Sequence, residues 1–393
     1  MALKSTTGIA TCLALLAALT AMPVVAADPY QIDVIVPLTG PGAFLGKGEQ
    51  QSLQLAEKAV NASGGIHGRP LQFVFQDDQS SPQIGVQLAS TVVAKKPAVV
   101  LGSSLVAICR AMAPLMKNGP VHYCFSPGLH PEPGAYSFTA SVSTHDLADA
   151  VVRYFRLKGW TRLAFMFSTD ATGQEFEEGV KGILALPENK TMSVVAAEHF
   201  ATSDVSVSAQ IQNIKAANPQ AFIAWSTGSP IATIFRGMVQ AGLDVPMATT
   251  DGNMTYAQMK QYASFLPKQL YIPAGQFIMR DTSGQPPAVV KAHAEFYKAY
   301  DSIGEKPDEP AELAWEPAMI IVHALRTLPP NATAAQLHDF LIHLKGYAGV
   351  DGVYDFEKVP QRGLDVTNAV ITLWSDKAQT WEVVSKAGGT PLP

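Results

Sequence analysis

Five short polar loops carry the hydroxyl and carboxyl side chains that could bind or transform a small molecule. Each loop follows an apolar run of strand length. In parallel α/β sheets ligands bind at the carboxyl ends of strands, where N–H groups at helix starts favour anions. One such loop is ordinary, because Ser, Thr and Asp cap helices, but five in two matching units favour a polar cleft. The loops contain Ser103 with Ser104, Ser126 with Gly128, Asp170 with Thr172, Thr227, and Asp251 with Asn253.

One arrangement suggests catalysis, namely Ser103 or Ser126 as a nucleophile with His130 as its base. The spacing of Ser126 and His130 allows contact, but no orienting acid or oxyanion motif accompanies the pair. The sequence also has no zinc helix or Cys-x-x-Cys pair, and the glycines of the loop 40–48 are wrongly spaced for a nucleotide. We therefore expect a binding protein with no catalytic residue, cofactor or metal site, and an exported hydrolase is the alternative.

Charge and composition restrict the partners. The 393 residues contain 28 Lys and Arg against 33 Asp and Glu, a formal charge of −5, with no dense basic cluster. Nucleic acid and anionic membrane surfaces both require dense positive charge, so neither is an expected partner. The hydrophobic content of 47% excludes a disordered chain, and the length allows two or three domains.

The first 27 residues have the pattern of a secretory signal peptide. Lys4 precedes an apolar run from Ile9 to Val25, and Ala26 and Ala27 provide a small-residue cleavage site before Asp28. Thr and Pro interrupt the run, which favours a cleaved signal over a membrane anchor. We expect an exported protein that begins at Asp28.

Two of the three cysteines lie beyond this segment. Cys109 and Cys124 are an even pair in a chain expected to reach an oxidising compartment. The pair predicts either a disulfide that closes a short loop or two buried thiols that act as small apolar residues.

The elements that must position the loops alternate between strand and helix. Apolar runs such as Ile32–Val36 and Val121–Phe125 are separated by amphipathic stretches, and the pattern restarts at Leu163–Phe167. This alternation predicts an α/β fold with two parallel sheets covered by helices. Three helices without intervening strands are predicted between residues 288 and 344, followed by a β meander over Gly352–Trp381.

Several motifs resemble one known family. They are the run Pro37–Gly46, the pattern Asn-x-x-Gly-Gly-Ile-x-Gly-Arg at Asn61–Arg69, and the pair Asp77 and Asp78. They are similar to the periplasmic solute-binding proteins of branched-chain amino-acid type ABC transporters, and the resemblance covers nearly the whole chain after residue 27. It implies two Rossmann-like lobes joined by a three-crossover hinge, with a ligand held in the cleft between them by hinge closure.

The resemblance also implies domain boundaries. Residues 28–143 and 274–349 would form the first lobe, and residues 144–273 and 350–393 the second. The crossovers would lie near Ser141–Asp146, Tyr271–Gly275 and Ala348–Gly352.

Residues of the cleft follow from the same resemblance. The hydroxyls and backbone of the first-lobe loops would bind a carboxylate, and Asp251 matches the acid that meets an amine. His130 and Thr172 replace residues usual in amino-acid-binding relatives, and the run Tyr123–Pro131 resembles the branch that takes up aromatic carboxylates. An aromatic ring would need apolar walls. Phe44, Phe125 and Trp225 would provide them, and core packing is the alternative for Phe125 and Trp225.

We expect a monomeric periplasmic protein that captures a small carboxylate and delivers it to an ABC permease of the inner membrane. The expected ligand is an aromatic acid, either benzoate-like or phenylpropenoid-like. The alternatives are a branched-chain or other amino acid, and a sensor domain that reports ligand occupancy to a signalling partner.

Overall fold

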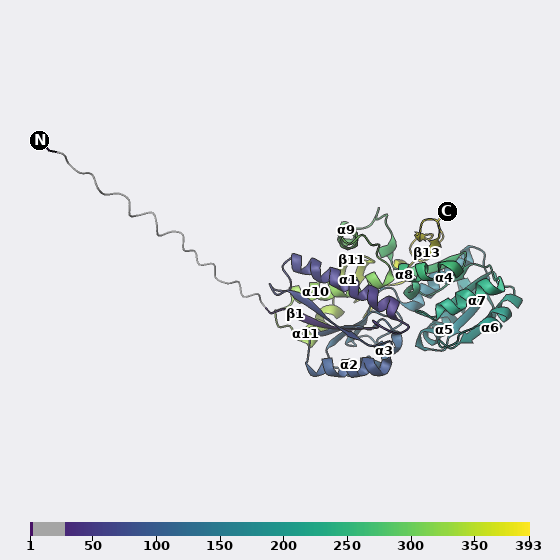
Figure 1. Cartoon of the computed structure of the whole chain (residues 1–393), viewed down its shortest axis with the longest axis horizontal. Coiled ribbons are helices and arrows are strands. Elements are labelled where there is room, and N and C mark those ends of the chain that lie inside the picture. Colours follow the sequence, from purple (N-terminus) through teal and green to yellow (C-terminus); the bar gives the residue numbers. More distant parts are fainter. Residues whose placement is uncertain (3–27) are drawn as a thin grey trace.

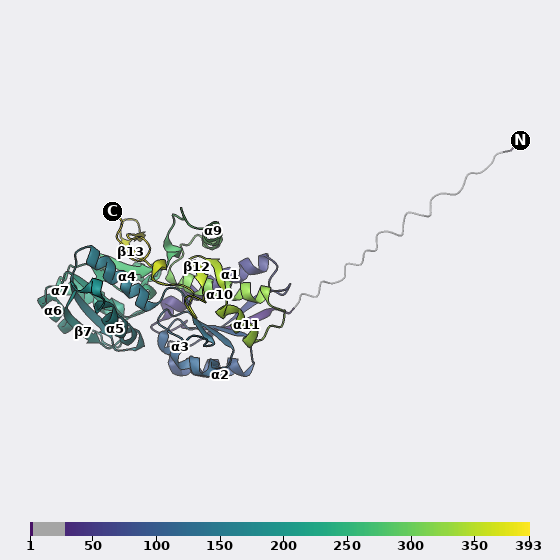
Figure 2. The same cartoon turned by 180° about the vertical axis from the view of Figure 1, so that it is seen from behind.

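Two lobes, each built on its own β-sheet, lie side by side in the computed structural model (Figure 1). The structure describes residues 1–2 and 28–393, so the predicted signal peptide lies almost wholly outside the described residues. The early purple and blue part of the chain and a later green part form one lobe, and the teal part forms the other. The view from behind shows the same separation (Figure 2).

The sheet of the first lobe has five parallel strands in the order β2-β1-β3-β4-β5. Its apolar strands are buried because helices cover them, as expected for a parallel sheet. The strands are β1 (Tyr30–Val36), β2 (Leu71–Asp77), β3 (Val99–Gly102), β4 (Val121–Cys124) and β5 (Ser137–Thr139). The helices that connect them are α1 (Ala43–Ala62), α2 (Pro82–Ala94) and α3 (Val106–Met112).

The sheet of the second lobe has seven strands in the order β14-β13-β10-β9-β8-β6-β7. Its first five strands along the chain pair in parallel, and the last two pair antiparallel. The strands are β6 (Arg162–Ser168), β7 (Ser193–Phe200), β8 (Ala221–Trp225), β9 (Met247–Ala248), β10 (Leu270–Ala274), β13 (Val370–Ser375) and β14 (Thr380–Val383). The helices are α4 (Thr144–Leu157), α5 (Ala171–Leu184), α6 (Ser208–Ala216), α7 (Ile231–Ala241) and α8 (Tyr256–Tyr262).

Three helices then return to the first lobe: α9 (Pro287–Asp301), α10 (Glu309–Thr327) and α11 (Ala334–Ile342). Helix α10 packs along α1, and both views place α10 and α11 with the first sheet (Figures 1 and 2). Thr333 caps α11 through a reciprocal capping box with Gln336. The prediction of three successive helices is therefore confirmed.

The closing segment differs from the predicted meander. Strands β11 (Lys345–Gly349) and β12 (Gly352–Asp355) form an antiparallel hairpin, and β12 does not join the second sheet. Tyr354 of β12 packs against Tyr347 of β11, and Phe356 packs against Phe138 of the first sheet. The first strand candidate of the predicted meander, Val353/Tyr354, is therefore present as β12, but its predicted place in a meander with β13 is wrong, because it pairs with β11.

A disulfide joins helix α3 to strand β4. Cys109 and Cys124 are bonded and fully buried beside Leu129. The sequence allowed either a disulfide or two buried thiols, and the structure has the disulfide. It holds the start of the loop that carries Ser126 against α3.

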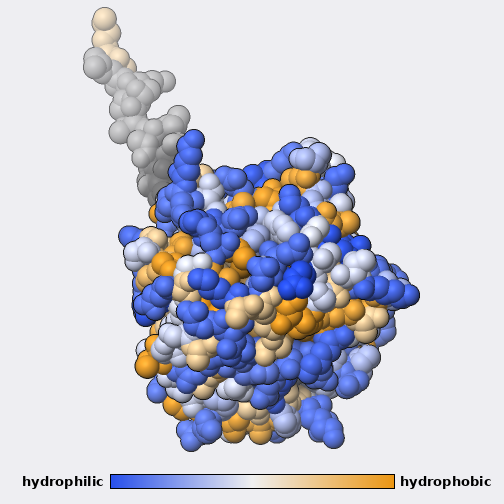
Figure 3. All heavy atoms as spheres, turned by 90° about the vertical axis from the view of Figure 1, so that its right-hand side faces the viewer, coloured by the Kyte–Doolittle hydropathy of each residue, from blue (hydrophilic) through white to orange (hydrophobic). Residues whose placement is uncertain are grey.

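The outer surface mixes polar and apolar side chains. The face at the second-lobe end shows hydrophilic residues interspersed with smaller hydrophobic patches (Figure 3). Within residues 1–2 and 28–393, no helix has the length and apolar character needed to cross a bilayer.

Candidate functional site

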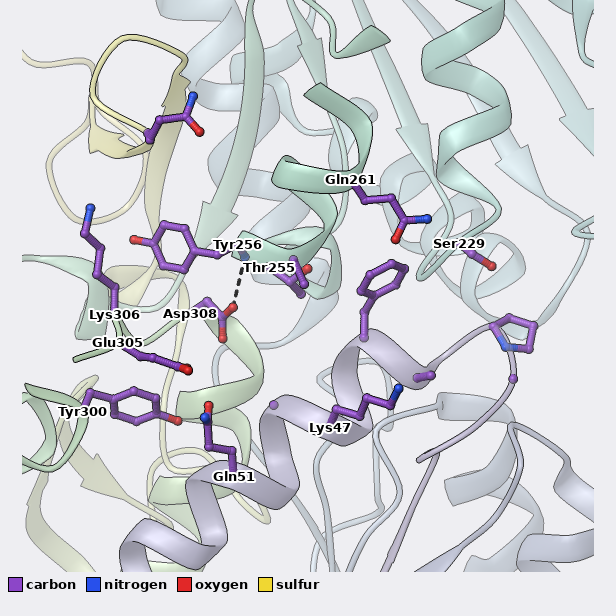
Figure 4. Close-up of a pocket in the computed structure, with 17 residues that line it drawn as sticks. Lys47, Gln51, Ser229, Thr255, Tyr256, Gln261, Tyr300, Glu305, Lys306 and Asp308 are labelled. Atoms are coloured by element: carbon purple, nitrogen blue, oxygen red, sulfur yellow. Dashed lines mark hydrogen bonds between the residues drawn. The ribbon is translucent and has the colours of Figure 1, made fainter. Parts of the chain in front are cut away.

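Two hollows lie where the lobes meet. The larger is an open groove of about 770 Å³ that runs between α1 on one side and α8 on the other (Figure 4). It contains one of the predicted binding residues, Phe44, together with Lys47, Tyr256 and Asp308. The smaller is a narrow cavity of about 30 Å³ deeper between the lobes.

The smaller cavity collects seven of the thirteen predicted binding residues, and on that ground we take it as the candidate site. Its walls come from loops of both sheets, as expected for ligands at the carboxyl ends of parallel strands. The seven residues are Ser104, Ser126, Gly128, Thr172, Trp225, Thr227 and Asp251. The cavity is also lined by Leu45, Leu105, Val106, Pro127, Thr144, Glu175, Thr250, Gly252 and Leu313.

The first-lobe wall presents hydroxyls. Ser104 Oγ donates to Glu49 Oε2 at 3.1 Å, and burial raises the pKa of Glu49 to about 8. Ser126 Oγ accepts from the Gly128 N–H at 3.4 Å. Both serines are only 6% exposed, so their hydrogen-bonding capacity is directed inward.

A buried arginine supports this wall from behind. Arg362 donates to the carbonyls of Pro127 and Leu129, at 2.9 and 2.8 Å, and to those of Ala140 and Ser141, both at 3.1 Å. These bonds fix the loop after β4 against the segment Ala140–Ser141. The positions of Ser126 and Gly128 therefore depend on a residue more than 230 positions away in the sequence.

The second-lobe wall combines an aromatic face with an acid. Trp225 stacks on Phe176 of α5 with ring centroids 3.9 Å apart, which fixes the indole at the end of β8. Asp251 follows β9, and its Oδ1 accepts from Thr250 Oγ1 at 2.6 Å. Burial raises the pKa of Asp251, and its Oδ2 has no hydrogen-bond partner among the described residues. The carboxyl of Glu309 lies beside Asp251, and burial raises the pKa of Glu309 well above its ordinary value. An ammonium group in the cavity would pair with this acidic corner through Asp251.

Six predicted residues lie outside this cavity. Phe125 is in the core of the first lobe, and Phe44 lines the open groove, where its ring meets Tyr262 edge-on. Ser103 donates to Asp78 Oδ2 at 2.6 Å, beneath the cavity wall. For Phe125 the alternative interpretation from the sequence, core packing, is therefore the observed one.

The remaining three outside the cavity have structural partners. Asp170 caps α5 by accepting from the N–H groups of Thr172 and Gly173, both at 3.2 Å. Asn253 ties the loops after β8 and β9 together through Gly228 N and Ser226 O. His130 contacts Glu175 at the rim.

The sequence reasoning missed nine lining residues. Thr172 and Glu175 are three residues apart on α5, so helical spacing could have revealed Glu175 once Thr172 was chosen. Thr250 and Gly252 flank Asp251 directly. Leu313 carries no such signal, because only the folded chain brings α10 to the cleft.

Direct contacts hold the lobes together around the cavity. The Ser229 N–H donates to the Pro41 carbonyl at 3.2 Å, and the Tyr256 N–H donates to Asp308 Oδ2 at 3.1 Å (Figure 4). A cavity of about 30 Å³ has room for one or two water molecules. A ligand of several heavy atoms can therefore enter only if the lobes separate.

The chain matches a family model described as periplasmic binding protein over residues 29–372. The Leu/Ile/Val-binding protein homolog 1 of Brucella abortus (strain 2308) is 26% identical over 289 residues, which are 70% of this chain and 72% of that protein.

Solved structures share the fold. An extracellular ligand-binding receptor from Rhodopseudomonas palustris HaA2 has a TM-score of 0.77 at 21% identity, covering 91% of this chain and 100% of its own. The substrate-binding protein LivJ of a Streptococcus pneumoniae branched-chain amino acid transporter, solved with isoleucine, has a TM-score of 0.75 at 18% identity, covering 91% of this chain and 99% of its own. These similarities confirm the predicted two-lobe α/β fold.

Proposed function

Because this chain belongs to the periplasmic binding protein family, we propose that it is the substrate-binding component of an ABC importer for a small carboxylate. The observation that carries the proposal is a buried cavity with hydroxyls on one lobe and an aromatic face and an acid on the other. Ligand would bind one lobe first and bring the other onto it by hinge bending.

The lining supports an α-amino acid as the ligand. The Ser126 hydroxyl and the first-lobe backbone could meet a carboxylate, and Asp251 could pair with an ammonium group across the cleft. The Brucella relative's name points the same way. Leu45, Val106 and Leu313 would surround an aliphatic side chain.

An aromatic acid is the second candidate, and Trp225 is the observation that favours it. Its indole lines the cavity, whereas Phe125 and Phe44 do not. A benzoate-like ligand would use this face for its ring and would leave Asp251 unpaired.

Asp251→Asn separates the two ligand classes. A screen of melting temperature against branched-chain amino acids and aromatic acids identifies the ligand, and a saturating ligand at about 100 times Kd adds about 2.7 kcal/mol of stability. For an amino acid, Asp251→Asn should lower affinity by at least tenfold, because the ammonium loses its anion. An aromatic acid should bind the variant at least as well as the wild type.

Asp170→Asn is the matched control, because Asp170 caps a helix just outside the cavity. It should leave the affinity of either ligand class unchanged. If neither class raises the melting temperature of the wild type, the proposed ligand chemistry is wrong.

Location and partner follow from the proposed role. The protein would be periplasmic and monomeric and would present its closed form to an inner-membrane permease, with lobes at the predicted boundaries. Deletion of the gene should abolish uptake of the ligand by cells. Normal uptake with a lost behavioural or transcriptional response would favour the sensor alternative.

A further inference from the structure

Two histidines and a glutamate converge at the rim of the cavity. His130 Nε2 lies 2.6 Å from Glu175 Oε1, and His145 Nε2 lies 2.9 Å from the same oxygen. The two imidazole rings stack with centroids 4.3 Å apart. All three potential ligand atoms lie within 4.8 Å of one another.

We propose that His130, His145 and Glu175 bind a divalent transition-metal ion, with Zn²⁺ as the best fit, at the junction of the two lobes. Two imidazole nitrogens and one carboxylate are a known ligand set for Zn²⁺ that leaves a fourth position open. No sequence motif indicates this site, because its three residues come from separate segments and no two have metal-helix spacing.

Hydrogen bonding alone leaves this cluster incomplete. Both Nε2 atoms approach one carboxylate oxygen, yet the buried His145 Nε2 makes no hydrogen bond of acceptable geometry to any described residue. A metal ion shared by the three atoms would satisfy that nitrogen.

The distances require only a small adjustment. Bonds of about 2.1 Å to a tetrahedral ion place the ligand atoms about 3.4 Å apart. The Nε2 atoms of His130 and His145 now lie 2.6 and 2.9 Å from Glu175 Oε1, so they must move away from it by about 0.8 and about 0.5 Å. The side chains of His130 and His145 are 35% and 43% exposed and can move, whereas that of Glu175 is 4% exposed and fixed in the cleft wall.

The site spans the two lobes. His130 lies in the first-lobe loop after β4, while His145 lies in the first turn of α4 and Glu175 on α5 of the second lobe. All three ligands meet only when the lobes are together, so the ion should stabilise the closed conformation. Glu175 also lines the cavity, so the ion would lie at the edge of the proposed ligand site.

The test is isothermal titration of Zn²⁺ into protein purified from cells that express the full chain and stripped with a chelator. We expect one equivalent to bind and His130→Gln, His145→Gln and Glu175→Gln each to weaken binding at least tenfold. Substitution of Co²⁺ should give visible absorption bands of a tetrahedral site, which the same variants should lose.

His199→Gln is the matched control. His199 Nε2 lies 2.8 Å from Glu177 Oε2, and Glu177 is two residues from Glu175 on the same helix. The variant should therefore bind Zn²⁺ with wild-type affinity. Melting curves without metal show whether a variant folds. If Glu175→Gln does not fold, the metal affinity of His130→Gln tests the proposal, because His130 is exposed and its substitution should leave the fold intact. No saturable binding at 100 µM Zn²⁺, unchanged affinity in the three variants, or equal loss in His199→Gln would each overturn the proposal.

Gly179→Ala tests the geometry without removing a ligand. A Cβ at Gly179 of α5 would lie 2.1 Å from His145 Cδ2 and 2.5 Å from its Nε2, so the imidazole must shift. Affinity for Zn²⁺ should fall at least tenfold. Gly182→Ala on the same helix has nothing within 4 Å of its Cβ and should bind as wild type; equal affinity in both variants would contradict the assigned position of His145.

Discussion

Ser104 and Ser126 both line the cavity, but they offer a ligand different groups. The Ser104 hydroxyl donates to Glu49, so its proton is already used. Ser126 Oγ only accepts, from the Gly128 N–H, so its proton is free for a carboxylate among the described contacts. The two serines are chemically identical, and the difference between them comes from their neighbours.

Ser126→Ala should therefore weaken ligand binding more than Ser104→Ala. A hydrogen bond to a charged group contributes about 1.5–3 kcal/mol, so Ser126→Ala should raise Kd roughly 10- to 100-fold. Calorimetric titration of the two variants with the ligand from the screen provides the comparison. Equal losses, or a larger loss for Ser104→Ala, would contradict the assignment of Ser126 to the carboxylate.

At the scale of elements, the disulfide between α3 and β4 closes a short loop. Cys109 and Cys124 are 15 residues apart. Closing a loop of that length lowers the conformational entropy of the unfolded chain, which adds about 3 kcal/mol to the free energy of unfolding. The double variant Cys109→Ala with Cys124→Ala should lose about 2–4 kcal/mol in free energy of unfolding.

Urea denaturation of the double variant and of reduced wild type measures this loss. The reduced wild type should lose a similar amount, because both lack the cross-link. A double variant as stable as the oxidised wild type would show that the bridge does not constrain the unfolded chain.

Helix α10 and helix α1 bury carboxyl groups that make stability depend on pH. Burial raises the pKa values of Glu49 and Glu316 from 4.5 to about 8. The folded state therefore retains protons that the unfolded state releases. Each group contributes stability that is fully present below about pH 4.5 and is lost as pH rises through about 8.

Glu316→Gln should flatten the pH dependence of stability. One titrating group changes the free energy of unfolding by at most about 1.4 kcal/mol per pH unit. Chemical denaturation between pH 5 and 8 should show a slope that is less negative in Glu316→Gln by about 1 kcal/mol per unit. Glu382→Gln, at an exposed position, should leave the slope unchanged; an unaltered slope in Glu316→Gln would contradict the assigned proton.

Local sequence pattern predicted most elements and part of the site. Apolar runs and helical spacing located β1, β8 and α7, because burial and periodicity act over a few residues. Short elements such as β5 and α8 have too few residues to show a strand or helix periodicity, so the sequence does not predict them. The sequence predicts that β12 belongs to a meander with β13, but β12 pairs with β11, because the choice of strand partner depends on tertiary packing.

The candidate site shows the same division. Ser104, Ser126 and Asp251 follow strands, so their place at the sheet edges could be predicted from their loops. Leu313 and His145 could not, because the return of α10 and the stacking on His130 exist only in the folded chain.

At the scale of the whole molecule, the lobes touch through backbone atoms at Gly228 and Pro41. Gly228 has a φ of +85°, and a Cβ there would lie 2.4 Å from the Pro41 carbonyl oxygen in the other lobe. Backbone on both sides leaves little freedom to relax. A side chain at this position should therefore hold the lobes apart.

Gly228→Ala should weaken ligand binding at least tenfold. With ligand present, its radius of gyration should be larger than that of the ligand-bound wild type. Small-angle X-ray scattering with and without ligand measures this change. Gly284→Ala is the matched control, because Gly284 has a φ of +82° and nothing within 4 Å of its Cβ. If Gly228→Ala contracts on ligand binding as the wild type does, this contact does not limit closure.

A crystal structure of the protein with the compound that most raises its melting temperature would show whether the ligand binds in the smaller cavity. We expect ligand density between Ser126 and Gly128 of one lobe and Trp225, Thr227 and Asp251 of the other, with the carboxylate toward Ser126. Density in the groove beside Phe44 and Tyr256, with the deeper cavity unchanged, would contradict it.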